Sequence, residues 1–340
     1  MKNWRLVALV GFIIITAAMI TPSLAEEKQH EQVNIDILSM GFGGSGYVAS
    51  FALSDIINKK SSWLRATCRQ TGGSVENIKT LAAEPQRRKS TVIYSSYIAP
   101  YLSARGLKPF QSKYANARAL SLAMNIMQFF STLDPNIKSG ADFAGKRIGF
   151  PPRASIGYLT QQLVMEYTWN VWDKTKKEFL GWSECVNALR DGMVDVAITN
   201  PIMAGDTALA SPAIVELLAG RKKVYFIPIT ENDLKIAREK SGYPVAKSLT
   251  CPAGALGPKQ PEAIEGGRAV NGWWVDAEFP DDVAYEICRV IYEHYKDFWP
   301  YHASLKGLNP EVMGAAAENE SEFHKAAAKF YKEHGIKMGF

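Results

Sequence analysis

The residues of this 340-residue chain that could do chemistry gather in short loops between strand-like and helix-like segments. The first loop, Gly41-Phe42-Gly43-Gly44-Ser45-Gly46, joins an alternating segment at residues 33–38 to helical spacing at residues 47–58. Such a turn presents backbone N–H groups and the positive end of a helix dipole, and glycine lets a bound group approach closely. It predicts an anionic or carbonyl-bearing ligand, and a plain tight turn is the alternative. The candidate ligand-binding residues here are Gly43, Gly44, Ser45 and Gly46.

Four later loops follow the carboxyl ends of expected strands. Residues 64–68 predict a strand, then a glycine loop, then a helix over 75–83 with Ser74 as its N-cap. Expected strands at 91–94, 146–150 and 194–198 also end in loops with hydroxyl, arginine or asparagine residues. Because ligands of open α/β sheets bind at the carboxyl ends of strands, we expect one shared site. The candidates on these loops are Thr71, Gly72, Gly73, Ser74, Asn77, Ser95, Ser96, Arg153, Ser155, Tyr158 and Asn200.

Two further residue types bear on the ligand. Arg153 follows two prolines directly before a helix, where its guanidinium is able to hold a carboxylate bidentately, and a solvent-facing arginine is the alternative. Trp273 and Trp274 lie on an expected strand over 269–275, so side-chain alternation directs one toward the cleft and one toward the core. The sequence does not say which; Trp273 is kept as a candidate, with core packing as the alternative for either.

Catalytic motifs are weak or missing in the sequence. Gly41, Gly43 and Gly46 fit G-x-G-x-x-G, but Cys68-Arg69-Gln70 stands where a dinucleotide site requires an acidic residue. Neither Ser45 nor Ser74 fits G-x-S-x-G, and the five histidines lie outside the proposed loops. The pattern therefore predicts binding without catalysis, with no cofactor and no metal, over the alternative of a cleft enzyme.

The first 25 residues have the composition of a secretory signal. Two cationic residues precede an apolar run over residues 6–20, and Ser23-Leu24-Ala25 places small residues where a signal peptidase reads. We expect residues 1–25 to be cleaved, giving a periplasmic chain with no stable membrane insertion. An uncleaved anchor is the alternative, although the run is short for a span of roughly 20 residues.

The net charge and the cysteine spacing argue against nucleic acid and metal ions as partners. The formal net charge is +5, and removal of Lys2 and Arg5 leaves 5 − 2 = +3, which is too mild to argue for nucleic acid. The four cysteines form no CxxC or other metal spacing, and the sequence leaves open three full pairings as well as free thiols. They are Cys68, Cys185, Cys251 and Cys288.

Length and periodicity predict a two-lobe α/β protein. Alternating strand and helix patterns are typical of parallel sheets flanked by helices. Residues 118–130 form an extended run too long for an ordinary strand of about 5–6 residues, so we expect it to cross between lobes through a hinge, with 269–275 returning. Lobe I is predicted to comprise 33–128 and 230–340, and lobe II 129–229. Residues 231–269, rich in proline and glycine, are expected to be irregular.

Taken together, the loops resemble a known family. The likeness covers nearly the whole expected mature chain, and its most specific piece is Thr71-Gly72-Gly73-Ser74-Val75-Glu76-Asn77. On these residues the chain resembles the TAXI-type solute receptors of TRAP transporters. The other matching segments are Gly41–Gly46, Ile137-Lys138-Ser139, Gly145-Lys146-Arg147-Ile148, Pro151-Pro152, Leu189–Asp195 and Cys251-Pro252-Ala253-Gly254.

The resemblance implies a type II periplasmic-binding fold, no catalysis, and delivery of a small solute to an ion-gradient-driven permease. Relatives of that type bind glutamate, glutamine or 2-oxoglutarate. This chain departs from them in the loop Arg153-Ala154-Ser155-Ile156-Gly157-Tyr158 and in the segment Glu84–Ser90, which lacks their small acidic pattern. Its tryptophan pair adds aromatic bulk, so a larger organic acid stays open as ligand. A sensory receptor of the same fold that feeds a signalling partner is the alternative function.

Overall fold

The computed structural model describes residues 31–42, 44–151 and 156–340 of the chain. The predicted signal segment at 1–25 therefore lies outside the described residues, as do three candidate ligand-binding residues, Gly43, Arg153 and Ser155. In the described ranges, no helix combines the length and the apolar character needed to cross a membrane.

Three parallel strands begin the sheet, and they lie where the alternating sequence predicts them. These strands are β1 (Val33–Leu38), β2 (Leu64–Arg69) and β3 (Thr91–Ser96). Strand β1 pairs in parallel with β2 on one side and with β3 on the other. Ile35 and Ile37 point into the core, as expected for a strand with one apolar face.

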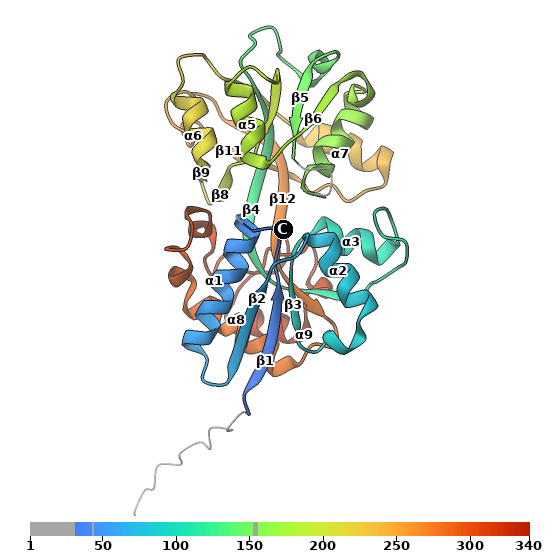
Figure 1. Ribbon diagram of the computed structural model, residues 1–340, viewed down its shortest axis with the longest axis vertical. Helices are drawn as coiled ribbons and strands as arrows, with labels where there is room; N and C mark the ends of the chain where they lie inside the picture. Colours follow the sequence, from blue (N-terminus) through green and yellow to red (C-terminus); the bar gives the residue numbers. More distant parts are fainter. Residues whose placement is uncertain (1–30, 43, 152–155) are drawn as a thin grey trace, which may run out of the picture. The chain divides into compact units, whose positions relative to one another are not determined.

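Two long antiparallel strands join the two lobes of the sheet (Figure 1). Strand β4 (Ala117–Thr132) pairs with β12 (Ile264–Asp276) along its first part, and β12 also pairs with β3. From Phe129 onward, β4 instead pairs with a strand of the second lobe. The prediction that residues 118–130 continue from one lobe into the other is therefore confirmed. The residue boundaries of the lobes stay a prediction.

The second lobe repeats the parallel arrangement on a smaller scale. Strand β5 pairs in parallel with β6 and β7, whereas β7 and β10 run antiparallel to β4. Short strands β8, β9 and β11 extend the sheet beside β4 and β12. The bounds are β5 (Arg147–Phe150), β6 (Lys176–Phe179), β7 (Val196–Thr199), β8 (Ile202–Ala204), β9 (Thr207–Leu209), β10 (Tyr225–Ile227) and β11 (Ser248–Cys251).

Helices cover the sheet in both lobes (Figure 1). In the first lobe, α1 packs on β2 and α8, while α2 packs on β3 and α3. In the second lobe, α5 packs on α6 and β7. The bounds are α1 (Ser45–Lys60), α2 (Ser74–Ala83), α3 (Ile98–Arg105), α4 (Leu159–Leu163), α5 (Trp182–Arg190), α6 (Pro212–Ala219), α7 (Glu231–Ser241), α8 (Asp281–Glu293) and α9 (Lys325–Glu333).

Each lobe buries its own apolar core. The core of the first lobe joins β1 to β3 with α1, α8 and α9, and both Trp273 and Trp274 lie in it. The second lobe has a core between β4, β5 and the helical segment from α4 onward, to which Phe130, Val164 and Met165 belong. Each lobe thus consists of packed layers around a core, and β4 and β12 are continuous strands between them.

One expectation about the chain path is wrong. Residues 231–269 were expected to be irregular, yet they hold helix α7, strand β11 and the start of β12. Thr230 and Asp233 form a capping box at the start of α7, which satisfies two otherwise unpaired amide groups. Leu234 and Ala237 then anchor α7 in the core. The Thr-x-x-Asp signal in the sequence outweighs the prolines that follow it.

Candidate functional site

The first-lobe loops are held together by Asn77. Its side-chain Nδ2 donates to the carbonyl oxygens of Leu38, Ser39 and Tyr94, at 3.2, 2.7 and 2.9 Å. These carbonyls stand at the carboxyl ends of β1 and β3, so one buried amide fixes both strand ends. Asn77 is fully buried, and its role in this structure is to position the loops.

Two hydroxyl groups add to this connection. Thr71 donates from Oγ1 to the carbonyl of Ser39 at 2.8 Å. The backbone N–H of Ser96 donates to Ser74 Oγ at 3.0 Å, which links the loop before α2 to the end of β3. Ser74 was predicted as the N-cap of α2, and that prediction is wrong. Gly73 takes the cap position at φ +107°, a conformation open to glycine, and Ser74 is already inside the helix.

The amide groups of the second glycine loop are used within the chain. The N–H of Gly72 donates to Glu76 Oε2 at 2.8 Å, and the N–H of Gly73 donates to Thr71 Oγ1 at 3.1 Å. These two amides therefore have partners of their own. The loop contributes shape and hydroxyl groups to the site more than it contributes unpaired N–H groups.

The start of α1 differs from this loop because no side chain caps it. Gly44 is the N-cap residue, it makes no side-chain cap bond, and the first turn carries no acidic residue. Ser45 is half-buried, whereas Gly46 is buried and closely packed. A Cβ on Gly46 would lie 2.6 Å from Met40 Sδ and from Tyr94 Cε1, so glycine is required there by packing. The uncapped amides of this helix end favour a negative charge.

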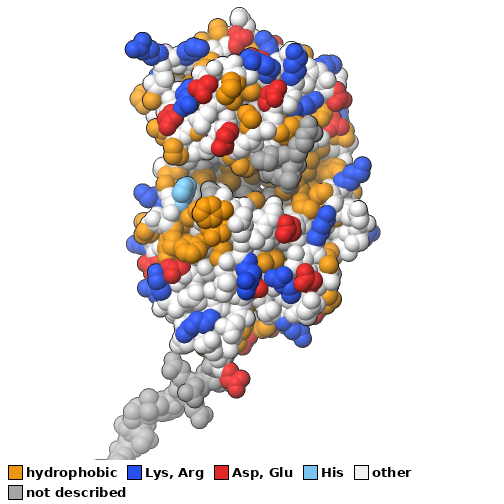
Figure 2. All heavy atoms as spheres, in the orientation of Figure 1, with side chains coloured by type: hydrophobic (Ala, Val, Ile, Leu, Met, Phe, Trp, Pro, Cys, Tyr) orange, Lys and Arg blue, Asp and Glu red, His pale blue; other side chains and the backbone are white. Residues whose placement is uncertain are grey.

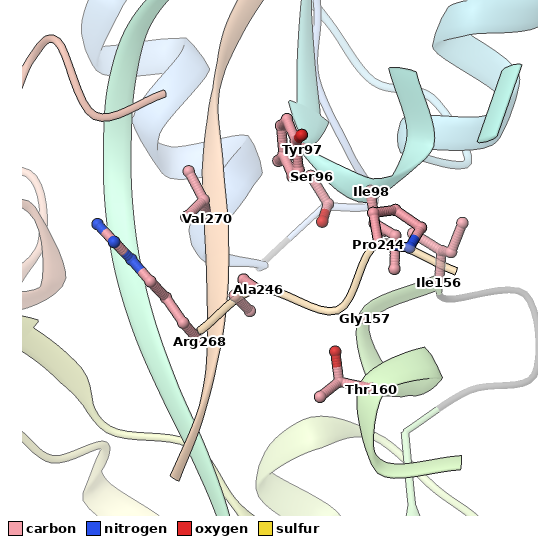
Figure 3. Close-up of a pocket in the computed structure, with 11 residues that line it drawn as sticks. Ser96, Tyr97, Ile98, Ile156, Gly157, Thr160, Pro244, Ala246, Arg268 and Val270 are labelled. Atoms are coloured by element: carbon pink, nitrogen blue, oxygen red, sulfur yellow. The ribbon is translucent and has the colours of Figure 1, made fainter. Parts of the chain in front are cut away.

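A pocket lies where the first-lobe loops face the second lobe (Figure 3). Ser96, at the end of β3, stands on one side, and Gly157, just before α4, and Thr160, within α4, stand on the other. The pocket is partly open, and about 20 Å3 of it is available to water-sized groups. The lining residues are Ser96, Tyr97, Ile98, Ile156, Gly157, Thr160, Pro244, Ala246, Arg268, Ala269 and Val270.

The surface between the lobes is also hollowed on the face shown in Figure 2. Hydrophobic side chains gather around this hollow, whereas lysine, arginine and acidic side chains are spread over the outer surface. Phe42, in the first glycine loop, is 78% exposed, and its ring lies 5.2 Å from that of Tyr47.

A family model described as NMT1-like matches residues 37–335, which is most of the chain. The chain belongs to the NMT1-like family. A solved structure of a periplasmic transporter is 12% identical and covers 90% of this NMT1-like chain and 95% of its own, with a TM-score of 0.51. MatC from Rhodopseudomonas palustris with bound malate, also 12% identical, covers 90% and 96%, with a TM-score of 0.50. At this identity the likeness shows the fold, which is that of the periplasmic solute-binding proteins.

The remaining candidates of this NMT1-like protein occupy different surroundings. Of the two serines at the end of β3, Ser96 lines the pocket, whereas Ser95 is fully buried and donates to the carbonyl of Ser96. Tyr158 packs its ring against Phe150 and Phe179. Asn200 is half-buried directly after β7, and it is not one of the residues that line the pocket.

Both tryptophans are in the core, which corrects the expectation that one of them faces an open cleft. Trp273 is fully buried between Tyr94 and Phe298, with ring centroids 6.5 and 5.9 Å away. Trp274 is also buried and lies against Tyr97. Helices cover both faces of the sheet at this point, so alternation sends each side chain into a packed layer.

Arg268 is a residue of the site that the sequence analysis missed. Its side-chain stem lines the pocket, while its guanidinium points away across β4 (Figure 3). There Nε donates to Asn125 Oδ1 at 2.9 Å, and Cζ lies 4.5 Å from the ring centroid of Phe340. Burial lowers the pKa of Arg268 to about 10, so the group stays cationic at neutral pH. No carboxylate of the described residues forms an ion pair with it.

The signal for Arg268 was present in the sequence but ambiguous. An arginine within an apolar strand marks an unusual position, and two glycines, Gly266 and Gly267, come directly before it. A Cβ on Gly267 would lie 3.0 Å from Thr160 Cγ2, so the glycine brings β12 close to α4. Only the pairing of β12 with β4 shows that this place is the hinge between the lobes.

Metal and thiol chemistry find no support in the described part of the chain. No group of three His, Cys, Asp or Glu side chains there is arranged to hold a metal ion. All four cysteines are free, and Cys185, Cys251 and Cys288 are buried. Burial raises the pKa of the Cys185 and Cys288 thiols to about 12, which leaves them protonated and unreactive.

Proposed function

We propose that this NMT1-like protein is an extracytoplasmic receptor that captures a small carboxylate between its two lobes. The ligand would be glutamate, glutamine, 2-oxoglutarate or a larger organic acid. The observation that carries the proposal is the convergence of Ser96 with Gly157 and Thr160 at one pocket between the lobes. The fold of periplasmic solute-binding proteins and the malate bound by MatC support it.

The anionic end of the ligand would bind at the start of α1. The uncapped first turn of this 16-residue helix offers backbone N–H groups and a positive dipole end to a carboxylate. Gly44, Ser45 and Gly46 would supply the amides and Ser96 a hydroxyl, whereas the Thr71 hydroxyl is already donated to the carbonyl of Ser39 and would only help to hold the loop in place. Of the second-lobe candidates, Tyr158 and Asn200 are described, and Arg153 and Ser155 remain predictions outside the described residues. A receptor with micromolar affinity needs about −8 kcal/mol in total.

We further infer that the protein delivers its solute to a membrane permease driven by an ion gradient, as a TAXI-type receptor of a TRAP transporter. The resemblance of Thr71-Gly72-Gly73-Ser74-Val75-Glu76-Asn77 supports this assignment. Residues 1–25 would direct export and be removed. No catalytic step and no cofactor are part of the proposal.

Titration calorimetry tests the binding proposal. The wild-type protein is titrated with L-glutamate, L-glutamine, 2-oxoglutarate, malate and an aromatic carboxylate. Binding of at least one of these with a thermal shift supports the proposal. The absence of heat and of thermal shift with every one of them contradicts it.

A matched pair of variants places the anion site. Ser45→Asp puts a carboxylate at the first residue of α1, where the dipole accepts it, so the fold should be no less stable. That carboxylate should weaken ligand binding by about tenfold or more, a difference of about 1.4 kcal/mol. Ser183→Asp makes the same change in the first turn of α5, and affinity there should not change. Equal affinities of the two variants would contradict the α1 site.

A further inference from the structure

Arg268 is the only charged residue that lines the pocket in the described part of the chain. Its guanidinium has five N–H donors, and among the described residues one bond uses them, from Nε to Asn125 Oδ1 at 2.9 Å. The other neighbour of the guanidinium is the ring of Phe340, whose centroid lies 4.5 Å from Cζ. Both neighbours are neutral, so they hold the side chain without cancelling its charge.

This charge differs from that of other partly buried arginines. Arg88 and Arg289 each form an ion pair with a carboxylate of the chain. Arg268 is half-buried as well, but burial is the cause of its lowered pKa, and no neighbouring charge contributes to that shift. A cation that loses water without gaining a counter-charge has a desolvation cost. The positive charge of Arg268 is therefore available to an anion that the chain does not supply.

The one carboxylate that is hydrogen-bonded to a lining residue has a different partner. Tyr97 lines the pocket, and its OH donates to Glu322 Oε1 at 3.4 Å. Glu322 itself does not line the pocket, and no other acidic residue of the described ranges does. The charged groups that line the pocket in these ranges thus amount to one cation and no anion.

Two contacts bring both walls of the pocket to the strand that carries Arg268. The N–H of Tyr97 donates to the carbonyl of Val270 at 2.9 Å, which joins the end of β3 to β12. On the opposite side, a Cβ on Gly267 would lie 3.0 Å from Thr160 Cγ2, so α4 approaches β12 one residue before Arg268. β12 therefore connects the two walls, and Arg268 lies between these contacts (Figure 3).

A carboxylate is the group that complements this lining. The hydroxyls of Ser96 and Thr160 are able to donate hydrogen bonds to its oxygens. The charge of Arg268 lies within one side-chain length of the pocket, in partly dehydrated surroundings where charges interact more strongly than in water. A carboxamide of the same shape accepts the same hydrogen bonds but has no charge. The difference in affinity between the two groups therefore measures the effect of Arg268.

We propose that Arg268 is a specificity-determining residue, which makes the pocket favour a carboxylate of the ligand over a neutral group in the same place. The ligand would then be a dicarboxylate, with one carboxylate at the start of α1 and the other in the pocket. The inference rests on the proposed function, because it assumes that the first carboxylate binds to the first lobe. The guanidinium acts through its charge from the position beside Asn125 and Phe340, so it needs no new hydrogen bond.

The test uses ligands of matched shape and arginines in matched surroundings. L-glutamate and L-glutamine differ in a carboxylate against a carboxamide, and 2-oxoglutarate and 2-oxopentanoate differ in a carboxylate against a methyl group. Arg268→Gln removes the charge, whereas Arg268→Lys keeps it. Arg105→Gln is the control, since Cζ of Arg105 also lies over a ring, 3.4 Å from the centroid of Tyr101, and Arg105 does not line the pocket.

The proposal predicts that wild type binds at least one dicarboxylate about tenfold or more tightly than its matched partner. Arg268→Gln should weaken that dicarboxylate about tenfold and change the affinity for the partner less than about twofold. Arg268→Lys should stay within about threefold of wild type, and Arg105→Gln should match wild type. Equal weakening of both ligands by Arg268→Gln, or an Arg268→Lys that behaves like Arg268→Gln, overturns the proposal.

Failures of the two proposals are distinguishable. If wild type binds none of the carboxylates, the proposed function fails, and the inference about Arg268 fails with it. If wild type binds a monocarboxylate, the aromatic one included, as tightly as the dicarboxylates, the proposed function stands and the role of Arg268 is overturned. A thermal unfolding scan of each variant confirms that the affinities compare folded proteins.

Discussion

Buried amide side chains in the two lobes differ in how many hydrogen bonds hold them. In the first lobe, Asn77 places its nitrogen against three carbonyl oxygens of the chain itself, and its Oδ1 alone is unpaired. In the second lobe, the side chain of Gln161 makes no hydrogen bond, and Gln128 uses its nitrogen alone. Asn77 is therefore tied to its neighbours in a way that Gln161 is not, and the two side chains should contribute differently to stability.

The largest expected change in stability comes from removing the Asn77 side chain. Asn77→Ala removes hydrogen bonds to three carbonyls and leaves these carbonyls buried, so the free energy of unfolding should fall by about 3 kcal/mol. Urea unfolding measures the change. Asn136→Ala, in an exposed turn, should change the same quantity by less than about 0.5 kcal/mol. A similar loss in both variants would mean that Asn77 does not connect the loops.

A smaller loss of stability is expected from removing one hydrogen bond among the same first-lobe loops. Ser74→Ala removes the acceptor for the Ser96 N–H, and the free energy of unfolding should fall by about 1 kcal/mol. The exposed Ser62 offers the same substitution with little effect on stability. If Ser74→Ala is as stable as Ser62→Ala, the hydrogen bond between α2 and β3 does not contribute to the free energy of unfolding.

Removing the Gln161 amide should change stability in the opposite direction. Gln161→Leu removes two unpaired amide atoms, so the ligand-free protein should be as stable as wild type or up to about 1 kcal/mol more stable. Chemical denaturation without ligand measures this. A loss of more than about 1 kcal/mol would show that Gln161 is a structural residue like Asn77, and the contrast between these two side chains would disappear.

The smallest effect concerns a region away from the pocket and depends on pH. His324 is buried at the start of α9, where its Nδ1 accepts from the N–H of Ala326, and burial lowers its pKa. Asp281 opposes this shift, whereas Lys325 and Arg118 add to it.

The folded protein therefore keeps the ring neutral, while the unfolded chain takes up a proton near pH 6.5. Stability from this group is present above that pH and is lost as the pH falls below it. His324→Asn keeps a capping side chain without the titration, so its stability should decline less between pH 7 and pH 5 than that of wild type. Parallel declines in the two proteins would contradict this assignment.

Local patterns predicted much of the frame. The alternation at Val33–Leu38 and the long apolar run through Phe130 locate β1 and β4 because each signal lies within one segment. The order of strand-to-helix loops likewise indicates which ends face the site. The fold class follows from this order and from the family resemblance together.

The details that failed depend on contacts between distant segments. The sequence predicts Ser74 as the cap of α2 because the backbone angle of Gly73 is invisible in it. It directs one of Trp273 and Trp274 toward a cleft because helices on both faces of the sheet are a tertiary feature. The signal at Arg268 is ambiguous for the same reason, since its meaning comes from its contacts with β4 and Phe340.

Hydrogen exchange measured by mass spectrometry tests the central claim most directly, namely that the residues of both lobes that line the pocket belong to one binding site. The protein is compared free and saturated with whichever carboxylate binds in the titrations. We predict slower exchange in residues 95–98 and in residues 156–160, with no change in helix α6. Slower exchange in one of these two segments alone, or in neither, would contradict a site shared by the two lobes.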